Sequence, residues 1–213
     1  MDPTAYEGWY HTPRGRWIGR QELALLLRLL RPVRGATLLD VGCGSGWFSR
    51  GFAGAGLQVV GMDPDAAMIA CARGQGGAVD YLQGDALQLP FADDSFDYCA
   101  AVTSLCFVRR PAQALAEMWR VSRRGVVLGL LNRHSLLYRR KRGRGAYRGA
   151  RWDTRAGVRS WLAPLEPAPR KQRWGTAVLL PSGSAGARLA EWLFHGRLPW
   201  GAFLAVYLGK QDR

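Results

Sequence analysis

The first 132 residues alternate short apolar runs with amphipathic stretches, a pattern typical of strands separated by helices. Residues 18–30 place apolar side chains on one helical face, and the pattern ends at Arg31-Pro32, where proline opposes continuation of a helix. The apolar runs at 36–42 and 57–63 are typical of strands buried on both faces. A short helix is expected between them, so the three elements predict a β-α-β unit.

The same alternation continues to residue 132. Residues 65–74 and 111–122 predict helices, the second beginning with a proline at a first-turn position. Strands are predicted at 80–85, 96–105 and 125–132. Four or five strands alternating with helices imply a mostly parallel sheet that carries helices on both sides.

The last third of the chain follows a different pattern. Residues 132–151 hold nine basic residues, counting His134, and no acid, which predicts a long loop or a loosely helical flap. A helix is expected at 153–165, and two strands at 175–181 and 201–209 joined by the segment 185–194. We expect one domain with a lead-in segment at 1–34, a core at 35–132, a basic flap or lid at 133–160 and C-terminal strands within 161–213.

Composition narrows the class of protein. At 213 residues and 48% hydrophobic content the chain can bury a full core. No apolar run reaches the roughly 20 residues of a membrane span, and the N-terminus lacks the order of a secretory signal, so we expect a cytoplasmic protein. The four cysteines show no CxxC pairing, and neither a disulfide framework nor a metal site is predicted.

The net charge of +14 is unevenly distributed along the chain. Twelve of the sixteen acids lie before residue 118, whereas twenty of the thirty Lys and Arg residues lie after it. The first half is therefore expected to carry the polar chemistry of a ligand site, and the second half a cationic surface.

Three glycines follow the first predicted strand, at Gly42, Gly44 and Gly46. Backbone without side chains lets a ligand approach closely and lets the chain turn tightly into a helix. A dinucleotide-binding fingerprint needs its third glycine at position 47, where this chain has Trp47, so a pyrophosphate ligand is disfavoured. Taken singly, each glycine could equally be a turn former.

Three acids stand at the ends of successive predicted strands. Ligands of open α/β sheets bind outside the carboxyl ends of the strands, where these acids are expected to meet. Asp40 suits a cationic partner better than a phosphate. Asp63 is placed to accept hydrogen bonds from ribose hydroxyls, and Asp85 could accept one from an exocyclic amine.

At these residues the chain resembles a known family. The segments "LLDVGCGSGWFS", "VVGMD", "GDALQLPFADDSFDYC" and "ALAEMWRVSRRG" are similar to the successive motifs of class I S-adenosylmethionine-dependent methyltransferases, in the broad "type 11" bacterial group. The resemblance covers residues 36–132. It implies a three-layer α/β fold with a Rossmann-like sheet of about seven strands, mostly parallel with an antiparallel strand near the C-terminus, and it implies the cofactor S-adenosylmethionine.

The resemblance also implies roles for individual residues. Asp40 and the loop Gly42, Cys43, Gly44 and Gly46 would contact the methionine part of the cofactor, and Asp63 would hold its ribose. Met62 or Pro64 would flank the adenine, Asp85 with Ala86 would meet the adenine amino edge, and Thr103 would complete the site. The glycine-rich R-N segment of the quinone methyltransferases is missing, so quinone methylation is not implied.

Methyl transfer needs alignment of nucleophile, methyl and sulfur more than it needs a catalytic side chain. Where a base is used, His134 or His11 is the first choice, because an unperturbed imidazole titrates near neutrality; either could instead be a surface residue, and His195 is expected to be structural. Further candidates near the expected acceptor pocket are Tyr6, Tyr10, Ser104, Cys106, Asn132 and Tyr138.

The basic cluster has three interpretations, and the class of acceptor therefore stays open. It could be a lid with cations facing an anionic substrate, a patch for nucleic acid, or a solvated face. The N/D-P-P-Y/F signature of amino-methylating enzymes is absent, and a small-molecule acceptor, anionic or aromatic, is favoured over RNA. The alternatives to such an enzyme are an RNA methyltransferase and a cofactor-binding protein without catalysis. The oligomeric state stays open.

Overall fold

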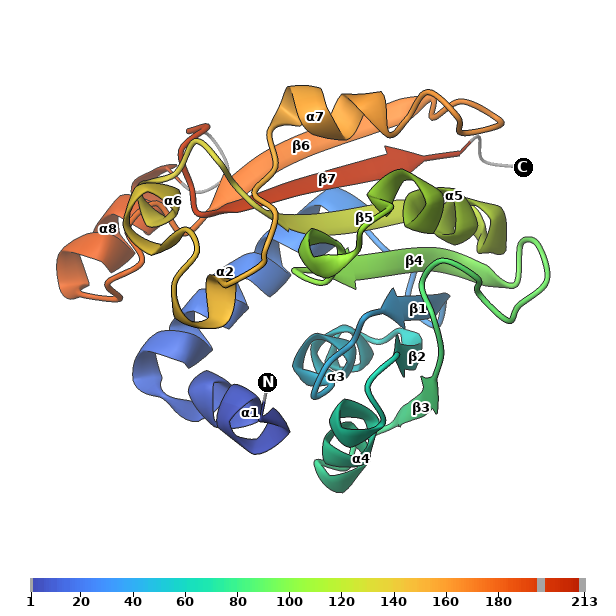
Figure 1. Ribbon diagram of the computed structural model, residues 1–213, viewed down its shortest axis with the longest axis horizontal. Helices are drawn as coiled ribbons and strands as arrows, with labels where there is room; N and C mark the ends of the chain where they lie inside the picture. Colours follow the sequence, from blue (N-terminus) through green and yellow to red (C-terminus); the bar gives the residue numbers. More distant parts are fainter. Residues whose placement is uncertain (1, 195–197, 211–213) are drawn as a thin grey trace.

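The computed structural model describes residues 2–194 and 198–210, which form one seven-stranded sheet between two layers of helices (Figure 1). The strand order is β3-β2-β1-β4-β5-β7-β6, and β7 alone runs antiparallel to its neighbours. This confirms the predicted three-layer, mostly parallel fold with an antiparallel C-terminal strand. The strands are β1 (Thr37–Val41), β2 (Gln58–Asp63), β3 (Val79–Gln83), β4 (Phe96–Val102), β5 (Ser122–Leu131), β6 (Lys171–Ala177) and β7 (Phe203–Gly209).

Two consecutive helices precede the sheet. The second, α2 (Pro13–Leu30), is the predicted lead-in helix extended by one turn at its start, and it ends at Arg31 in the left-handed conformation. The first, α1 (Pro3–His11), was not predicted. The Asp2 side chain caps it by accepting a hydrogen bond from the Thr4 N–H at 3.0 Å, and Pro3 occupies its first turn.

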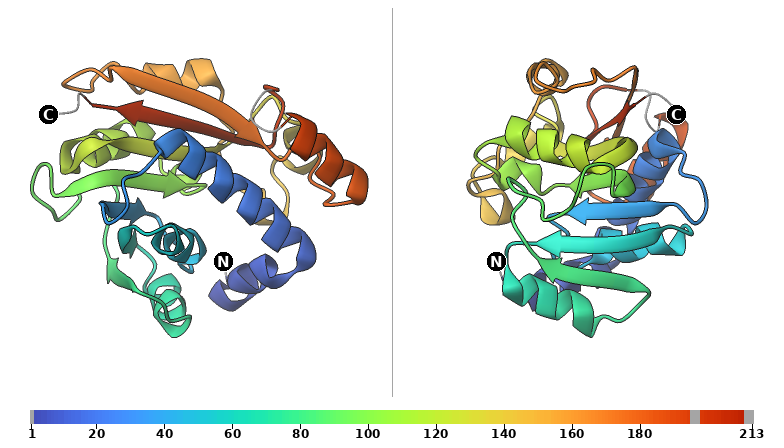
Figure 2. Two further views of the ribbon diagram at one scale, coloured as in Figure 1. Left: turned by 180° about the vertical axis from the view of Figure 1, so that it is seen from behind. Right: turned by 90° about the vertical axis from the view of Figure 1, so that its right-hand side faces the viewer.

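One face of the sheet packs against α2, α3 (Trp47–Gly54) and α4 (Ala66–Gly74). Seen from behind, α2 crosses this face diagonally (Figure 2). Leu25 and Leu26 of α2 and Phe52 of α3 are completely buried here. The helical apolar period of the lead-in segment therefore corresponds to a real packing surface.

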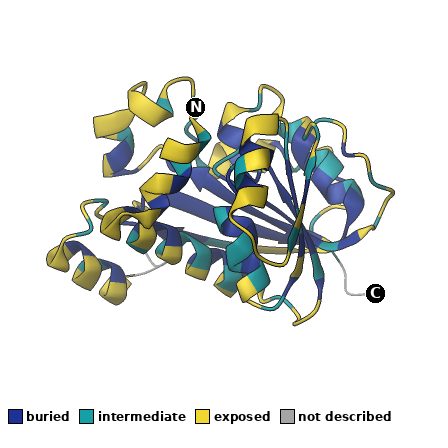
Figure 3. Cartoon of the chain, turned by 90° about the horizontal axis from the view of Figure 1, so that it is seen from below, coloured by how far each residue is buried: buried dark blue, intermediate teal, exposed yellow. Residues whose placement is uncertain are grey.

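The opposite face packs against α5 (Pro111–Val121) and α7 (Arg155–Ser160). Trp119 of α5 is buried, with its indole nitrogen donating to the Pro167 carbonyl at 3.0 Å. Figure 3 shows the strands buried between helices whose outer sides are exposed. The remaining short helices are η1 (Leu105–Phe107), α6 (Leu136–Lys141) and η2 (Gly145–Tyr147), and the last two lie in the segment predicted to be loosely helical.

The C-terminal region corrects two predicted boundaries. The helix predicted at 153–165 spans only Arg155–Ser160. The strand predicted at 175–181 spans Lys171–Ala177 instead, because the chain leaves the sheet at Val178, which has a φ of 64°. The segment joining the last two strands forms α8 (Ala185–Phe194). His195 lies outside the described residues.

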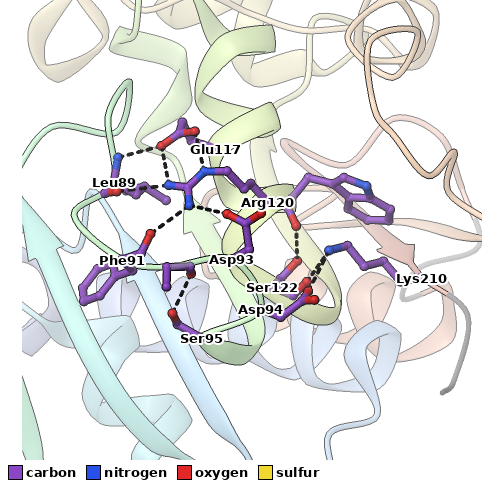
Figure 4. A network of polar contacts seen from close by, with 11 residues as sticks. Leu89, Phe91, Asp93, Asp94, Ser95, Glu117, Arg120, Ser122 and Lys210 are labelled. Carbon is purple, nitrogen blue, oxygen red and sulfur yellow. Dashed lines mark hydrogen bonds and ion pairs between the residues drawn. The ribbon is translucent and has the colours of Figure 1, made fainter.

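A polar network fixes the loop between β3 and β4 against α5 (Figure 4). The Arg120 guanidinium donates to the Glu117 and Asp93 carboxylates and to the carbonyls of Leu89 and Phe91, at 2.8 to 3.1 Å. Glu117 in turn accepts from the Leu89 N–H at 2.9 Å. This loop begins at the carboxyl end of β3, where residues 85 and 86 lie.

The packing of α2 on the sheet can be tested at Leu25. Its side chain is fully buried and lies against Gly175, where a Cβ would come within 2.8 Å of it. We expect Leu25→Ala to lower the free energy of unfolding by about 2–5 kcal/mol, measured by urea denaturation. Leu189→Ala, at a side chain that is 58% exposed on α8, serves as the control and should cost less than about 0.5 kcal/mol.

Candidate active site

A cavity of about 1140 Å³ lies at the carboxyl edge of the sheet. It is lined by residues that end or follow six parallel strands, and it is covered by α1, α2 and the segment containing η2. Its volume exceeds the usual range of about 300–1000 Å³ for the pocket of one small ligand. The strand-end residues in its wall are Val41, Gly42, Asp63, Gly84, Asp85, Val102, Thr103, Leu131 and Val178.

The glycine loop after β1 is tied to the end of β2 by backbone hydrogen bonds. The N–H groups of Gly42 and Cys43 both donate to the Met62 carbonyl, at 2.7 and 3.0 Å. Gly42 has a φ of 73°, and a Cβ there would lie 2.4 Å from the Ser104 Cβ. The position therefore needs glycine both for its conformation and for the close approach of β4.

Asp63 joins the glycine loop to the cavity. One carboxylate oxygen accepts from the Gly44 N–H at 2.9 Å, and the other accepts from the Asp65 N–H at 3.0 Å. The same side chain lines the cavity, and each carboxylate oxygen retains a second lone pair. A ligand with two neighbouring hydroxyls could be held here.

Asp40 lies beneath the glycine loop and is only 1% exposed. One carboxylate oxygen accepts from the Ser49 hydroxyl at 2.6 Å, whereas Oδ1 is buried and has no hydrogen-bond partner among the described residues. Burial raises the pKa of Asp40 to about 7, and the negative charge of Asp63 adds to this. A buried acid with an unsatisfied oxygen beside a cavity is suited to a cationic ligand.

Seven of the eleven residues predicted to bind cofactor line this one cavity. They are Gly42, Gly44, Asp63, Pro64, Asp85, Ala86 and Thr103. Four lie behind its wall. Asp40, Cys43 and Met62 are buried, with Met62 pointing into the core on the far side of Gly84, and Gly46 begins α3, facing the Tyr81 hydroxyl. Burial raises the pKa of the Cys43 thiol, so this side chain stays protonated.

Two β-branched residues of the cavity wall have a positive φ. Thr103 after β4 has a φ of 50°, and Val178 after β6 has a φ of 64°. Such backbone is costly for these residue types and persists only where the surroundings hold it. Thr103 donates its N–H to the Gly129 carbonyl, and the buried Glu191 carboxylate accepts from the N–H of Val178 at 2.9 Å. Strain of this kind concentrates at functional sites.

Helix α1 is fixed over the cavity by a buried ion pair. Glu7 is 4% exposed and accepts from the Arg50 guanidinium at 2.6 Å and from the Ser45 hydroxyl. Tyr10 stacks on Trp47 with ring centroids 4.7 Å apart. Trp47, which excludes a dinucleotide fingerprint in the sequence, therefore serves here as the packing partner of the N-terminal helix.

The part of the cavity under α1 and α2 is aromatic and apolar. Tyr6 and Tyr10 line it, with their hydroxyls 3.3 Å apart, and Tyr147 and Trp9 lie in the same wall. Burial raises the pKa of both Tyr6 and Tyr10, and it raises that of Tyr147 to about 12. These phenols therefore stay protonated near neutral pH and can act as hydrogen-bond donors.

Glu22 also lines the cavity, and the sequence interpretation missed it. The helical period of α2 contained a signal for it, because position 22 belongs to the same apolar stripe as Ile18, Leu25, Leu26 and Leu29. An acid within the buried face of an amphipathic helix is unusual and needs a partner or a function.

The predicted bases do not reach the cavity. His11 is exposed, with its ring nitrogen 3.4 Å from Glu7, and His134 is exposed on the flap. Asn132 is structural, since its amide donates to the carbonyls of Pro199 and Gly201. Tyr138 packs against Trp152 instead of the cavity.

Ser104 and Cys106 do line the cavity, but both are engaged in local structure. The Ser104 hydroxyl donates to the Val41 carbonyl at 2.8 Å, and the Cys106 thiol donates to the Thr103 carbonyl at 3.0 Å. Burial raises the pKa of Cys106 to about 12, which disfavours a nucleophilic thiolate.

Part of the basic segment forms the outer wall. Lys141, Arg144 and Arg148 line the cavity together with Arg14 of α2, whereas Arg139, Arg140 and Arg142 are exposed residues outside it. Part of the segment therefore faces the cavity and part is exposed to solvent, while its role as a lid stays a prediction.

Comparison with known proteins identifies the family. A methyltransferase-domain model matches residues 39–130. An uncharacterized methyltransferase of Mycobacterium avium is 34% identical over 186 residues, which cover 78% of this chain and 69% of that protein. The chain belongs to the class I S-adenosylmethionine-dependent methyltransferases. The resemblance seen in the glycine and acid motifs is thereby confirmed.

Two further matches show how much of this chain and of its relatives is similar. An uncharacterized methyltransferase of Mycobacterium marinum is 36% identical over 169 residues, which cover 75% of this chain but only 62% of that relative's length. A Thermotoga maritima structure described as a methyltransferase dependent on S-adenosylmethionine, "possible histamine N-methyltransferase", superposes with a TM-score of 0.76 at 24% identity, covering 98% of this chain and 96% of that one.

Within the described residues, no helix is long and apolar enough to cross a membrane.

The unusual acid Asp40 leads to a pH prediction. Its folded-state pKa of about 7 lies above the ordinary value of 3.8, so the folded protein binds this proton more tightly than the unfolded chain. The stability that this provides is complete below about pH 4 and is lost as the pH rises through 7. Between pH 4.5 and 8 we expect the wild type to lose about 2–4 kcal/mol more unfolding free energy than Asp40→Asn.

Urea denaturation at both pH values measures this difference, with Asp80→Asn on the exposed edge of β3 as the control. The control should follow the wild type. An Asp40→Asn variant that also follows the wild type would show that this carboxyl titrates normally.

Proposed function

We propose that this chain transfers a methyl group from S-adenosylmethionine to a small or medium organic acceptor. The observation that carries the proposal is one continuous cavity that joins the glycine loop and Asp63 to an aromatic compartment under α1 and α2. A donor at one end and an acceptor at the other would lie side by side, which is the arrangement that direct transfer requires.

The donor end fits the cofactor by the chemistry of its residues. Asp63 offers carboxylate oxygens to the ribose hydroxyls, and Pro64 with Ala86 offers apolar surface to the adenine. Asp85 is exposed at the end of β3, within reach of an exocyclic amine. The unpartnered oxygen of Asp40 lies beneath the loop that would meet the cationic methionine part. These assignments are proposals that rest on the geometry and the family.

The acceptor end accounts for the rest of the cavity wall. Ile18, Leu131, Leu137 and Ala202 supply aliphatic surface, and Tyr6, Trp9, Tyr10 and Tyr147 supply rings. This lining favours an acceptor with an aromatic or apolar body. The cations Arg14, Lys141, Arg144 and Arg148 would attract an anionic substituent on the outer side.

The reaction requires alignment and exclusion of water. When bound, the cofactor supplies a methyl group on a sulfonium sulfur, so the acceptor atom has only to approach in line with the C–S bond. Positioning of this kind contributes roughly 7–11 kcal/mol to lowering the barrier. The protein's part is to hold both molecules, and α1, which Glu7 and Arg50 fix in place, covers one side of the cavity.

The proposed role of Asp63 can be tested by calorimetry with S-adenosylhomocysteine, the product of transfer. Asp63→Asn keeps the size of the side chain and removes its charge. We expect binding to weaken by roughly 1–3 kcal/mol, the value of hydrogen bonds to a charged group. Asp80→Asn should bind like the wild type, and equal affinity in all three proteins would exclude Asp63 from the ribose site.

Catalysis itself is tested with S-adenosylmethionine labelled in the methyl group and a panel of aromatic amines, phenols and carboxylic acids. Transfer of label to one chemical class, together with product release, supports an enzyme. Tight cofactor binding with no transfer to any acceptor would favour a cofactor-binding protein without catalysis. Copurifying RNA and a steep loss of RNA binding with salt would favour an RNA methyltransferase.

A further inference from the structure

Glu22 is a carboxyl group in the acceptor compartment without a partner. It belongs to α2, where Arg14, Ile18 and Glu22 follow one another at intervals of four residues and all line the cavity. Within the described residues, no hydrogen bond or ion pair engages its side chain, in contrast to Glu7 and Glu191, which hold their neighbours firmly. Its carboxyl group is therefore available to a molecule in the cavity.

The surroundings of Glu22 are aromatic and weakly polar. Tyr6 and Tyr10 of α1 and Tyr147 of η2 are close enough for its negative charge to raise their own pKa values, after the larger effect of burial. Glu191 of α8 adds a second negative charge nearby. Ring faces and carboxylates both attract cations, so the position beside Glu22 favours a positively charged group, whereas the cationic side chains of the cavity lie in its outer wall.

From this geometry, and resting on the proposed methyl transfer, we propose that the acceptor is an amine on an aromatic or apolar body and that Glu22 binds its ammonium group and accepts its proton. An ammonium ion would give Glu22 the partner that the protein lacks, while the tyrosine rings would surround the adjoining carbons. A neutral alcohol would leave the carboxylate without a counter-charge.

The proton balance of the step is complete. The ammonium gives one proton to the Glu22 carboxylate and becomes a neutral amine with a free lone pair. That lone pair forms the N–C bond to the methyl carbon while the C–S bond breaks and its electron pair stays on sulfur. The product is a methylated ammonium and a neutral thioether, and Glu22 loses its proton to solvent before the next cycle.

The acidity of Glu22 suits this exchange. Burial, followed by the negative charge of Glu191, raises the pKa of Glu22 to about 8. That value brings the carboxyl close to the basicity of an amine, which is where proton transfer between the two is efficient. The cations in the outer cavity wall, Arg14, Lys141, Arg144 and Arg148, oppose the effect of Glu191 and are part of the same electrostatic environment.

The experiment measures binding of matched amines and alcohols to the protein saturated with S-adenosylhomocysteine. The pairs are 2-phenylethylamine with 2-phenylethanol, and tryptamine with tryptophol. In the wild type we expect each amine to bind at least about tenfold more tightly than its alcohol, since a hydrogen-bonded charge contributes about 1.5–3 kcal/mol. The amine affinity should rise from pH 6 to 8.5 as Glu22 ionises, while the alcohol affinity stays constant.

The matched variants are Glu22→Gln and Glu166→Gln, the second at an exposed residue outside the cavity. Glu22→Gln should lose the preference for amines and its pH dependence but keep the affinity for S-adenosylhomocysteine. Glu166→Gln should keep both. Glu22→Asp, which retains the charge at a shorter reach, should keep part of the preference for amines and so separates loss of charge from loss of packing.

The outcomes separate the two proposals. A wild type that does not bind S-adenosylhomocysteine contradicts the proposed function itself. A wild type that binds it but shows no preference for amines, or binds no amine at all, overturns the role of Glu22 and leaves methyl transfer standing. A preference for amines that persists in Glu22→Gln would also overturn the role of Glu22 and leave methyl transfer standing. If a variant does not fold, the comparison of amines with alcohols in the wild type still tests the proposal.

Discussion

The site depends on how the glycine loop is attached to the strand beside it. The parallel pairing of β1 and β2 brings the Met62 carbonyl under the N–H groups of Gly42 and Cys43, and Asp63 then holds the N–H of Gly44. The loop is thereby fixed by its neighbour and not by a bound molecule. It follows that the donor end of the cavity is preorganised, and little conformational entropy needs to be lost when a ligand binds.

The acceptor end is held by different interactions, made between segments far apart in the chain. Glu7 reaches across to Ser45 and Arg50, and Tyr10 stacks on Trp47, so the N-terminal helix is attached to α3 at two points. On the other side, Glu191 of α8 holds the turn after β6. These contacts combine a buried ion pair with aromatic packing, which fixes geometry more than it adds stability.

Most of the residues predicted to bind cofactor line one cavity, because the signals that selected them are local. A glycine after a strand and an acid at a strand end act within a few residues, and the parallel topology brings such strand ends together. The sequence could not predict that the side chains of Met62 and Asp40 point inward. Their direction depends on the pleat of the sheet, and the strand order of that sheet was unknown. Glu22 was missed because its signal lies in the helical face on which it stands, whereas the histidines were chosen by residue type alone, and the structure places both of them outside the cavity.

The two halves of the cavity wall come from different segments of the chain. Its donor half comes from the strand ends within residues 39–130, the span that the methyltransferase-domain model matches, while much of its acceptor half comes from residues 5–22 and 137–202. Under the proposed function, changes confined to the two outer segments would alter which acceptor is bound and leave the cofactor site intact.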